Sequence, residues 1–444
     1  MKKKLNKLLK KNVIGLIFII ASYNTFAQTT LIPDANFELA LINLGLDTVL
    51  DGQVLTANIS TVESINLDNL SISDLTGIED FNSLTNLSCK QNTLNFLDIT
   101  QNTELAILDC RFNQLNSLNI SQNTALLTVR CSNNLISNLN LTQNIELKYL
   151  YCSNNPLTSL NVTQNPDLFW LISNNTGLIN LDISQNPLLS ILECTNNQLT
   201  SLDFSQNPDL ITLQCDDNQL TNINPGTTSA LSILTCNNNS LNELQTDNLV
   251  NLESLSFNNN NITNLTLNAD FLQIINCNNN QLTSLDLSQS QNITFVSCTN
   301  NSQLTYIDVR NSLPAAINTL IAIDNPILSC IITDDPTFDH STNWQYDTLI
   351  SELVETEADC SFNLGVLGHN KLTQTIIYPN PTSNYFSIKS LKTPKTIKIF
   401  SLNGHLIKSY AYQDLYSVEE LSKGVYIIKL GHLNDSEVKL LLIE

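Results

Sequence analysis

The stretch LAILDCRFNQLNSLNISQNTA (residues 105–125) decides the fold, because the chain repeats its pattern many times. The next 21 residues, LLTVRCSNNLISNLNLTQNIE (126–146), place apolar residues, a cysteine and two asparagines at the same positions. Such units begin at residues 84, 105, 126, 147, 168, 189, 210, 231 and 252, looser ones at 272, 293 and 317, and a degenerate one at 62. A fixed period over 13 units predicts a stacked repeat architecture.

One unit cannot bury its own leucines, so each unit must stack on its neighbours. The alternation at Leu108 and Cys110 predicts a short strand with both of these side chains pointing inward. Neighbouring strands would pair in parallel about 4.8 Å apart, so the rungs would form a rod about 60 Å long. A unit of this length leaves no room for a regular helix after its strand. We therefore expect a mainly β fold, a parallel β-solenoid, over residues 62–330.

The unit matches the pattern L-x-x-L-x-L-x-x-N/C-x-L, with cysteine at the third apolar position. The chain therefore resembles the short, nested class of bacterial leucine-rich repeats. Independently of this resemblance, one asparagine of most units falls where the strand ends. A buried amide there can satisfy backbone groups that the turn leaves unpaired. This asparagine column comprises Asn92, Asn113, Asn134, Asn155, Asn197, Asn218, Asn239, Asn260, Asn280 and Asn301.

Residues 1–27 predict a secretory signal peptide, cleaved near Ala27. A basic region is followed by an apolar run that is too short to span a membrane. Removal of this segment, with six lysines and no acid, leaves 14 basic and 41 acidic residues, a net charge of −27. That charge argues against a nucleic-acid partner. The simpler interpretation of this negative charge is a solvated acidic surface. The more specific interpretation is that the acidic surface binds Ca²⁺. We expect no transmembrane segment in the mature chain.

Residues 28–61 predict an N-terminal cap, which a solenoid needs over its first rung. Asp34 is placed to start a helix, with Phe37, Leu41 and Leu44 on one face. The stretch also resembles the caps of similar surface repeat proteins.

Nine of the eleven cysteines occupy the repeat position, where Ser173 and Phe257 stand in two other units. A position that accepts Cys, Ser or Phe is a packing position, so these nine should be buried free thiols. Cys330 and Cys360 lie beyond the regular array and are predicted to form a disulfide. It would close a loop of about 30 residues and stabilise the fold by about 3.5 kcal/mol.

Cations and aromatic residues gather in a few consecutive units. We predict outward strand positions for Lys90, Arg111, Arg130, Tyr149, Tyr151 and Trp170, whereas later units present small polar residues there. Arg, Tyr and Trp anchor interfaces, and aromatic rings present a large apolar face. We therefore predict a ligand-binding patch on the concave sheet, formed by Arg111, Arg130, Tyr149, Tyr151 and Trp170, with Lys90 and Phe112 at its margin. The alternative is that these side chains only pack on one another across units.

A second regularity lies on the opposite face of the units. Asp98, Asn119, Asn140, Asn161, Asp182 and Asp203 form one column, and Thr100, Ser121, Thr142, Thr163, Ser184 and Ser205 form another. A flat array of short polar groups could bind ice or a mineral. Ordinary turn chemistry is the simpler explanation.

Residues 331–363 depart from the repeat and predict a C-terminal cap, and residues 364–377 predict a linker. Residues 378–444 change character, with eight lysines against six acids. Alternating segments and the hairpin dipeptide Asn403-Gly404 predict a small antiparallel β-sandwich there.

The same region carries a second resemblance, on Tyr378, Pro379, Asn380, Pro381, Gly404, Gly424 and Tyr426. Their order, spacing and position resemble the C-terminal sorting domain of type IX secretion, type A. The resemblance implies that the type IX secretion machinery carries the chain across the outer membrane. It also implies removal of the domain in the linker, followed by attachment to surface lipopolysaccharide or release.

No set of residues predicts catalysis, a cofactor or a metal site. None of the four histidines lies in the solenoid, which removes the usual general base for nucleophilic catalysis. Neither a glycine-rich phosphate loop nor zinc-ligand spacing occurs. We therefore expect a monomeric binding protein, secreted or on the outer-membrane surface, that recognises a protein or a glycan. The alternative is a structural rod that binds ice or mineral with its polar face, and a surface hydrolase is less favoured.

Overall fold

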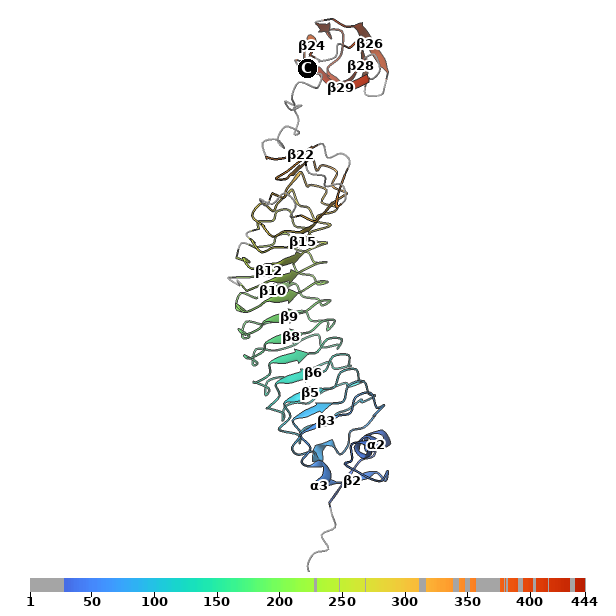
Figure 1. The fold of residues 1–444 in the computed structure, drawn as a ribbon, viewed down its shortest axis with the longest axis vertical. Coiled ribbons are helices and arrows are strands. Elements are labelled where there is room, and N and C mark those ends of the chain that lie inside the picture. The colour runs from blue at the N-terminus through green and yellow to red at the C-terminus, as the bar shows by residue number, and fades with distance from the viewer. Residues whose placement is uncertain are drawn as a thin grey trace, which may run out of the picture. The chain divides into compact units, whose positions relative to one another are not determined.

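The computed structural model describes residues 28–226, 230–246, 248–267, 269–310, 317–337, 343–347, 352–356, 376–378, 380, 382–389, 394–401, 405–413, 415–431 and 436–443 (Figure 1). The chain divides into two compact units, residues 1–360 and 361–444, and each is described by itself. The predicted signal peptide and most of the predicted linker lie outside the described residues.

The repeat forms the parallel β-solenoid that its period predicts. Each rung contributes a short strand whose second residue is buried, except in the last strand, where Gln345 is exposed. Each strand pairs in parallel with those of the rungs beside it. The resulting 14-stranded sheet, called here the long sheet, consists of β3 (Ser64–Asn66), β4 (Asn86–Ser88), β5 (Ile107–Asp109), β6 (Thr128–Arg130), β7 (Tyr149–Tyr151), β8 (Trp170–Ile172), β9 (Ile191–Glu193), β11 (Thr212–Gln214), β13 (Ile233–Thr235), β14 (Ser254–Ser256), β15 (Ile274–Asn276), β17 (Phe295–Ser297), β19 (Thr319–Ala322) and β21 (Trp344–Tyr346).

The second halves of some units form two smaller parallel sheets. Their strands are β10 (Ser201–Asp203) and β12 (Asn222–Asn224) in one, and β16 (Ser284–Asp286), β18 (Tyr306–Asp308), β20 (Cys330–Ile332) and β22 (Glu352–Val354) in the other. Since β21 and β22 extend the two longer sheets, the parallel pairing continues into the stretch that we predict as a C-terminal cap.

Residues 28–61 contain two short helices, α2 (Ala35–Asn43) and α3 (Thr56–Ile59), and an antiparallel pair of strands that the sequence did not predict, β1 (Thr29–Leu31) and β2 (Gln53–Leu55). A 3-10 turn, η1 (Ile78–Asp80), follows β3. Phe37 and Leu41 are buried as predicted. Leu44 is 53% exposed, because α2 ends before it and Leu44 leaves the buried face.

Asp34 ties α2 to the solenoid. Its Oδ1 accepts the backbone N–H groups of Asn36 and Phe37 at 2.9 and 3.1 Å. Its Oδ2 accepts the N–H and the hydroxyl of Ser73 at 2.7 and 2.8 Å and the N–H of Asp74 at 3.1 Å. One carboxylate therefore caps the helix and holds the loop that follows β3.

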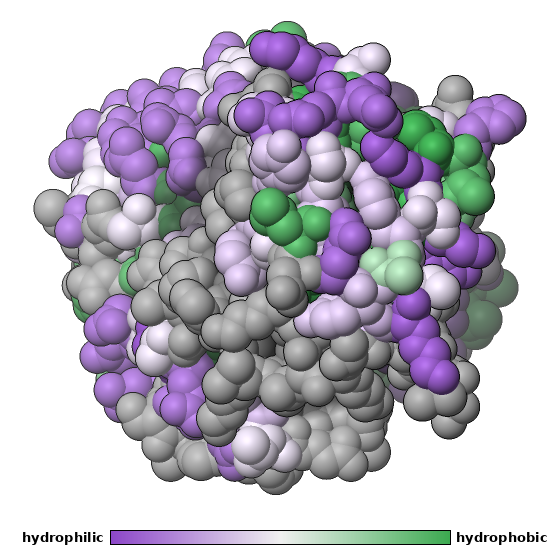
Figure 2. All heavy atoms as spheres, turned by 90° about the horizontal axis from the view of Figure 1, so that it is seen from above, coloured by the Kyte–Doolittle hydropathy of each residue, from purple (hydrophilic) through white to green (hydrophobic). Residues whose placement is uncertain are grey.

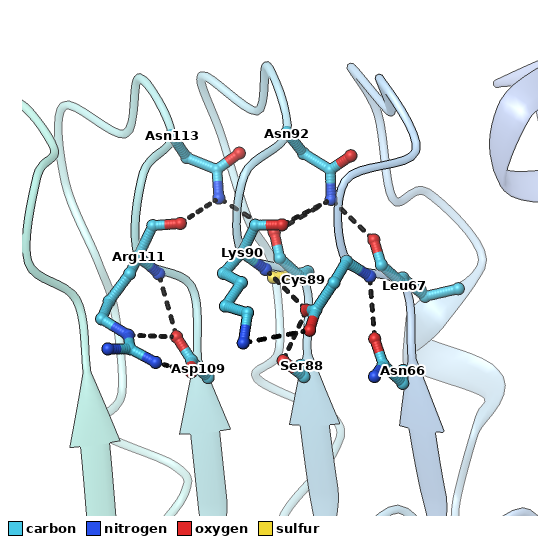
Figure 3. A network of polar contacts seen from close by, with 10 residues as sticks. Asn66, Leu67, Ser88, Cys89, Lys90, Asn92, Asp109, Arg111 and Asn113 are labelled. Atoms are coloured by element: carbon cyan, nitrogen blue, oxygen red, sulfur yellow. Dashed lines mark hydrogen bonds and ion pairs between the residues drawn. The ribbon is translucent and has the colours of Figure 1, made fainter.

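The predicted asparagine column is confirmed as a hydrogen-bond ladder (Figure 3). The Nδ2 of Asn113 donates to the carbonyl of Cys110 in its own rung, at 3.1 Å, and to that of Cys89 in the preceding rung, at 3.0 Å. Its Oδ1 accepts the N–H of Leu94 at 3.1 Å. Each amide thus satisfies backbone groups of two rungs that the turn would leave unpaired.

A second asparagine column, which the sequence analysis did not single out, joins the rungs at the other end of each unit. The Nδ2 of Asn123 donates to the carbonyls of Ile99 and Asn102 in the preceding rung, both at 2.8 Å. Asn144 repeats the arrangement one rung further on, with Ile120 and Asn123.

The turn before the ladder asparagine uses the left-handed backbone region. In most rungs the residue just before the column has a positive φ, and it is usually asparagine, which tolerates this conformation better than other side chains. Phe112 is an exception: its φ is 55°, and its side chain is 49% exposed.

All nine repeat cysteines are buried free thiols, as predicted. Burial raises the pKa of Cys131 to about 12, with an opposing backbone hydrogen bond and the nearby Asp109 carboxylate as smaller effects. These thiols are therefore packing residues and poor nucleophiles. Cys330 is disulfide-bonded. Cys360, its predicted partner, lies outside the described residues, so this pairing stays a prediction.

The second unit is the predicted antiparallel β-sandwich. One sheet consists of β23 (Ile376–Tyr378), β24 (Tyr385–Lys389) and β27 (Tyr416–Ser417), and the other of β25 (Thr396–Ser401), β26 (Leu406–Ala411), β28 (Gly424–Gly431) and β29 (Ser436–Ile443). Buried residues from both sheets, such as Phe386 and Ile399, form one core. Gly404, in the predicted hairpin turn between β25 and β26, lies outside the described residues, but the two strands do pair antiparallel.

We predict that Asn134→Ala destabilises the solenoid by about 3 kcal/mol, because it leaves a buried N–H and two buried carbonyls without partners. In the wild type the amide donates to Cys110 and Cys131 and accepts from Leu115. Urea denaturation measures the effect. The matched control is Asn138→Ala, an exposed position of the same unit, which should change stability by less than about 0.5 kcal/mol. Equal effects at both positions would contradict the role of the ladder.

Phe112→Asn should stabilise the protein by about 1 kcal/mol, because asparagine relieves the left-handed strain. The reciprocal change Asn133→Phe, at the same position one rung later, should destabilise it by a similar amount. Thermal unfolding of both variants checks the sign. Loss of stability in both would show that Phe112 packs usefully where it stands.

The pH dependence of stability should change in Asp34→Asn. Burial raises the pKa of Asp34, but hydrogen bonds from Ser73, Phe37 and Asp74 together lower it by more. The pKa therefore lies below the ordinary value of 3.8. The charged form therefore stabilises the fold above the unfolded pKa, and this contribution is lost as the pH falls through the folded pKa. Wild type should exceed the variant in free energy of unfolding at pH 7, and the gap should close as the pH falls through the lowered pKa of Asp34. A gap independent of pH would contradict this account.

Candidate binding surface

Four of the five predicted patch residues are brought together on the outward face of the long sheet. Because the middle residue of each strand is buried, the first and last residues face outward. Tyr149 and Trp170 are paired first residues of β7 and β8, and Arg130 and Tyr151 are paired last residues of β6 and β7. Parallel pairing in register thus places these four side chains on adjacent strands and on one face.

The aromatic rings form a continuous cluster. Tyr149 meets Trp170 edge to face, with ring centroids 5.4 Å apart and planes at 85°. Tyr151 approaches the same indole at 6.4 Å and 80°. Phe169 lies nearly parallel to Trp170, with ring centroids 6.3 Å apart, and meets Tyr149 edge to face at 6.2 Å. The cross-rung packing that we considered as the alternative is therefore present, and it also fixes the rings as one half-exposed surface.

Arg130 completes this cluster. Its guanidinium carbon lies 5.4 Å from the centre of the Tyr151 ring, a cation–π arrangement. Burial raises the pKa of Tyr151 and the neighbouring Arg130 lowers it, with a net increase. The phenol therefore stays neutral at pH 7 and can donate a hydrogen bond. We call Arg130, Tyr149, Tyr151, Phe169 and Trp170 the sheet-face patch.

Arg111 and Lys90 are not at outward strand positions, contrary to the sequence analysis. Each lies two residues beyond the end of its strand (Figure 3). Arg111 forms a two-bonded ion pair with the buried Asp109, with Nε–Oδ1 and Nη2–Oδ2 distances of 2.9 and 2.6 Å. Lys90 pairs with Asp68 at 3.3 Å. Both cations therefore have a local carboxylate, and Arg111 compensates a charge that burial would make costly.

Two members of this surface were missed in the sequence. Phe169 and Lys148 directly precede the outward residues Trp170 and Tyr149, and both are exposed. The residue just before each strand carries the signal, because this position is exposed beside the outward strand residues. Phe112 lies beside Arg111 with an exposed ring, at the margin where the sequence placed it.

Later rungs of the same face carry a polar ladder instead. The Oδ1 of Asn237 accepts the hydroxyl of Ser256 at 2.8 Å and the N–H of Asn258 at 2.7 Å. One rung earlier, the Asp216 carboxylate accepts the hydroxyl of Thr235 at 2.7 Å and the N–H of Asn237 at 2.6 Å. These short side chains satisfy one another at the last strand position and just beyond it, while the first strand positions of nearby rungs include the exposed Ile233 and Ile274. The sheet-face patch differs from these rungs in its continuous aromatic cluster.

The polar columns on the opposite face follow turn chemistry. The Oδ1 of Asp98 accepts the N–H and the hydroxyl of Thr100 at 2.9 and 2.7 Å, and Asn119 accepts those of Ser121 at 3.2 and 2.8 Å. These contacts explain why a short acceptor and a hydroxyl recur two residues apart.

The remaining predicted site residues belong to the second unit. Tyr378 is half-exposed at the end of β23, Gly424 begins β28, and Tyr426 donates its hydroxyl to the carbonyl of Ser422 at 2.7 Å. Pro379, Pro381 and Gly404 lie outside the described residues.

Within the described ranges, no group of three His, Cys, Asp or Glu side chains is placed to hold a metal ion. No described helix is long and apolar enough to cross a membrane. Seen from above, the described surface is mostly hydrophilic, with hydrophobic residues in small groups (Figure 2).

Comparisons with known proteins found a family match for the C-terminal region and solved structures similar to the solenoid. Residues 376–444 match the family model of the secretion system C-terminal sorting domain. No curated protein matches the chain by sequence. Among solved structures, the functional domain of InlJ from Listeria monocytogenes, described as including a cysteine ladder, is similar with a TM-score of 0.61 and 22% identity, over 94% of this chain and 99% of that one.

Two further structures are similar to parts of the chain. An internalin (InlF) from Listeria monocytogenes has a TM-score of 0.49 and 18% identity, over 63% of this chain and 89% of that one. A leucine-rich-repeat protein of Leptospira interrogans has a TM-score of 0.46 and 21% identity, over 66% and 87%. The similarity to InlJ and the sorting-domain match describe a chain that joins a leucine-rich-repeat solenoid to a type IX sorting domain, which implies export to the cell surface or the medium.

Proposed function

We propose that this exported leucine-rich-repeat protein binds a protein or glycan through the sheet-face patch. One observation carries the proposal: four aromatic rings and Arg130 form a continuous half-exposed group on one face of the long sheet. Aromatic and arginine side chains supply most of the binding energy at interfaces. Arg111, held by Asp109, lies beside Arg130's rung and extends the surface at its edge.

The rungs that carry the patch also depart from the repeat. In the rung of Trp170, Ser173 replaces the column cysteine and Thr176 the ladder asparagine. In the rung of Tyr149, Thr158 has a φ of 54°, a strained value for a β-branched residue. Local conflicts of this kind concentrate at functional sites. Of these departures, only the backbone of Thr158 is strained, and it supports a role for its rung beyond stacking; Ser173 and Thr176 are both hydrogen-bonded.

The alternatives receive less support. Hydrogen bonds within each turn account for the polar columns of the opposite face. These columns therefore give no separate support to an ice- or mineral-binding rod. A surface hydrolase would need a pair of catalytic side chains, and the patch offers aromatic rings and a guanidinium instead.

The proposal is tested with the purified secreted chain on glycan and host-protein arrays, with and without Ca²⁺. We expect a specific ligand, whose affinity falls at least about 30-fold in Tyr151→Ala combined with Trp170→Ala, since two interface anchors are lost. The matched control is Ser254→Ala combined with Ser256→Ala, on the same face several rungs away, which should bind like wild type.

Both double variants should keep melting temperatures within about 3 °C of wild type, because the exchanged side chains face outward. Full affinity in the aromatic variant would contradict the patch. A blank array in both conditions would favour the structural rod, and measurement of thermal hysteresis would then test it.

A further inference from the structure

The sorting domain has an apolar band on its outer surface. The buried core lies on one face of the sheet β26-β25-β28-β29, where Ile397, Ile399, Ile428 and Leu430 point. The alternate residues point the other way, away from the core. On that outer face Phe400, Ile427 and Leu440 are cross-strand neighbours. The register of β26 shifts by one residue at this point and places Leu406 opposite Phe400, so the row spans all four strands.

This row continues with a second apolar pair. Val425 of β28 lies opposite Leu442 of β29, next to Ile427 and Leu440. Leu440 is 58% exposed, Leu406 53%, Val425 41% and Leu442 37%. Six apolar side chains thus form one contiguous band. Exposed apolar groups of this kind mark interaction sites, because side chains that stay in contact with water do not add to the stability of the folded domain.

Two lysines border the band on the same face. Lys398 of β25 and Lys429 of β28 are directly opposite each other, two residues along their strands from Phe400 and Ile427. Like charges at facing positions destabilise a sheet. Among the described residues neither lysine has an ion-pair partner. The domain therefore keeps an unfavourable pair of cations beside an unfavourable apolar surface, a combination that an acidic, apolar partner would relieve.

The neighbouring edge of the sheet is already closed. Asn380 acts there like a short strand: its Nδ2 donates to the carbonyl of Leu440 at 2.9 Å, and its Oδ1 accepts the N–H of Leu442 at 2.8 Å. The N–H of Thr382 donates to the carbonyl of Leu442 at 2.9 Å. This part of β29 is therefore poorly placed for strand addition, and the face of the sheet remains as the docking surface.

We propose that the type IX secretion machinery reads the sorting domain through this face, with a protein surface that is apolar at its centre and acidic beside Lys398 and Lys429. In this arrangement the apolar band supplies the contact area, and the two lysines set the orientation. Asn380 is a positioning residue, which holds Leu440 and Leu442 in the band by fixing the last strand.

The first experiment measures export of the full chain from a bacterium with a type IX system, by comparing the amounts outside the cell and in the periplasm. Leu406→Thr combined with Leu440→Thr should reduce export about tenfold, because the band loses two anchors. Threonine favours strands, so the domain should stay folded. The matched control is Leu415→Thr, which is also 53% exposed but lies outside the band and should be exported normally.

The second experiment separates recognition from stability. Lys429→Gln removes the like-charge pair, so the melting temperature of the sorting domain in the full chain should rise while export falls severalfold. Lys395→Gln, a change at another exposed lysine of the domain, should leave export unchanged. Normal export of Lys429→Gln, or of the folded double threonine variant, would overturn the proposal. So would an export defect that appears only in variants with a lowered melting temperature.

Discussion

The asparagine amide that joins most rungs to the one before is the interaction on which the rest of the structure depends. A unit of 21 residues turns its backbone sharply after every three-residue strand, and each turn leaves buried carbonyls and N–H groups without strand partners. Asn113, Asn134 and the others of their column supply the missing partners on both sides. Because these partners belong to successive rungs, the same amide satisfies the turn and sets the stacking.

Regular stacking then decides what each side chain can do. The middle strand residue and the cysteine face the core, so the thiols are inert although the chain is built for export. The first and last strand residues face outward in register, so neighbours along the sheet lie 21 residues apart in sequence. Tyr149 and Trp170 therefore lie side by side on one surface, although no short sequence motif contains both residues.

The sequence predicted the solenoid, the sandwich, the asparagine ladder and the buried cysteines, because each follows from a period or an alternation. The sequence was a weaker guide to the position and contacts of individual side chains. Leu44 leaves the face of α2 because the helix ends one residue earlier than the apolar spacing suggested. Arg111 and Lys90 share a spacing with strand residues, but they pair with Asp109 and Asp68 in the turn beyond. Phe169 and Asn380 carry no periodic signal, since their roles depend on contacts across rungs and across sheets.

The most direct test of this account is native-state hydrogen exchange of the full chain. The backbone amides of Leu94, Leu115 and Ile136 each donate to a ladder asparagine of the next rung. If the ladder holds the rungs together, these three amides should exchange as slowly as those inside the long sheet and respond together to denaturant. Exchange at the rate of exposed turn amides would show that leucine packing alone holds the rungs, and that the ladder is a consequence of the fold.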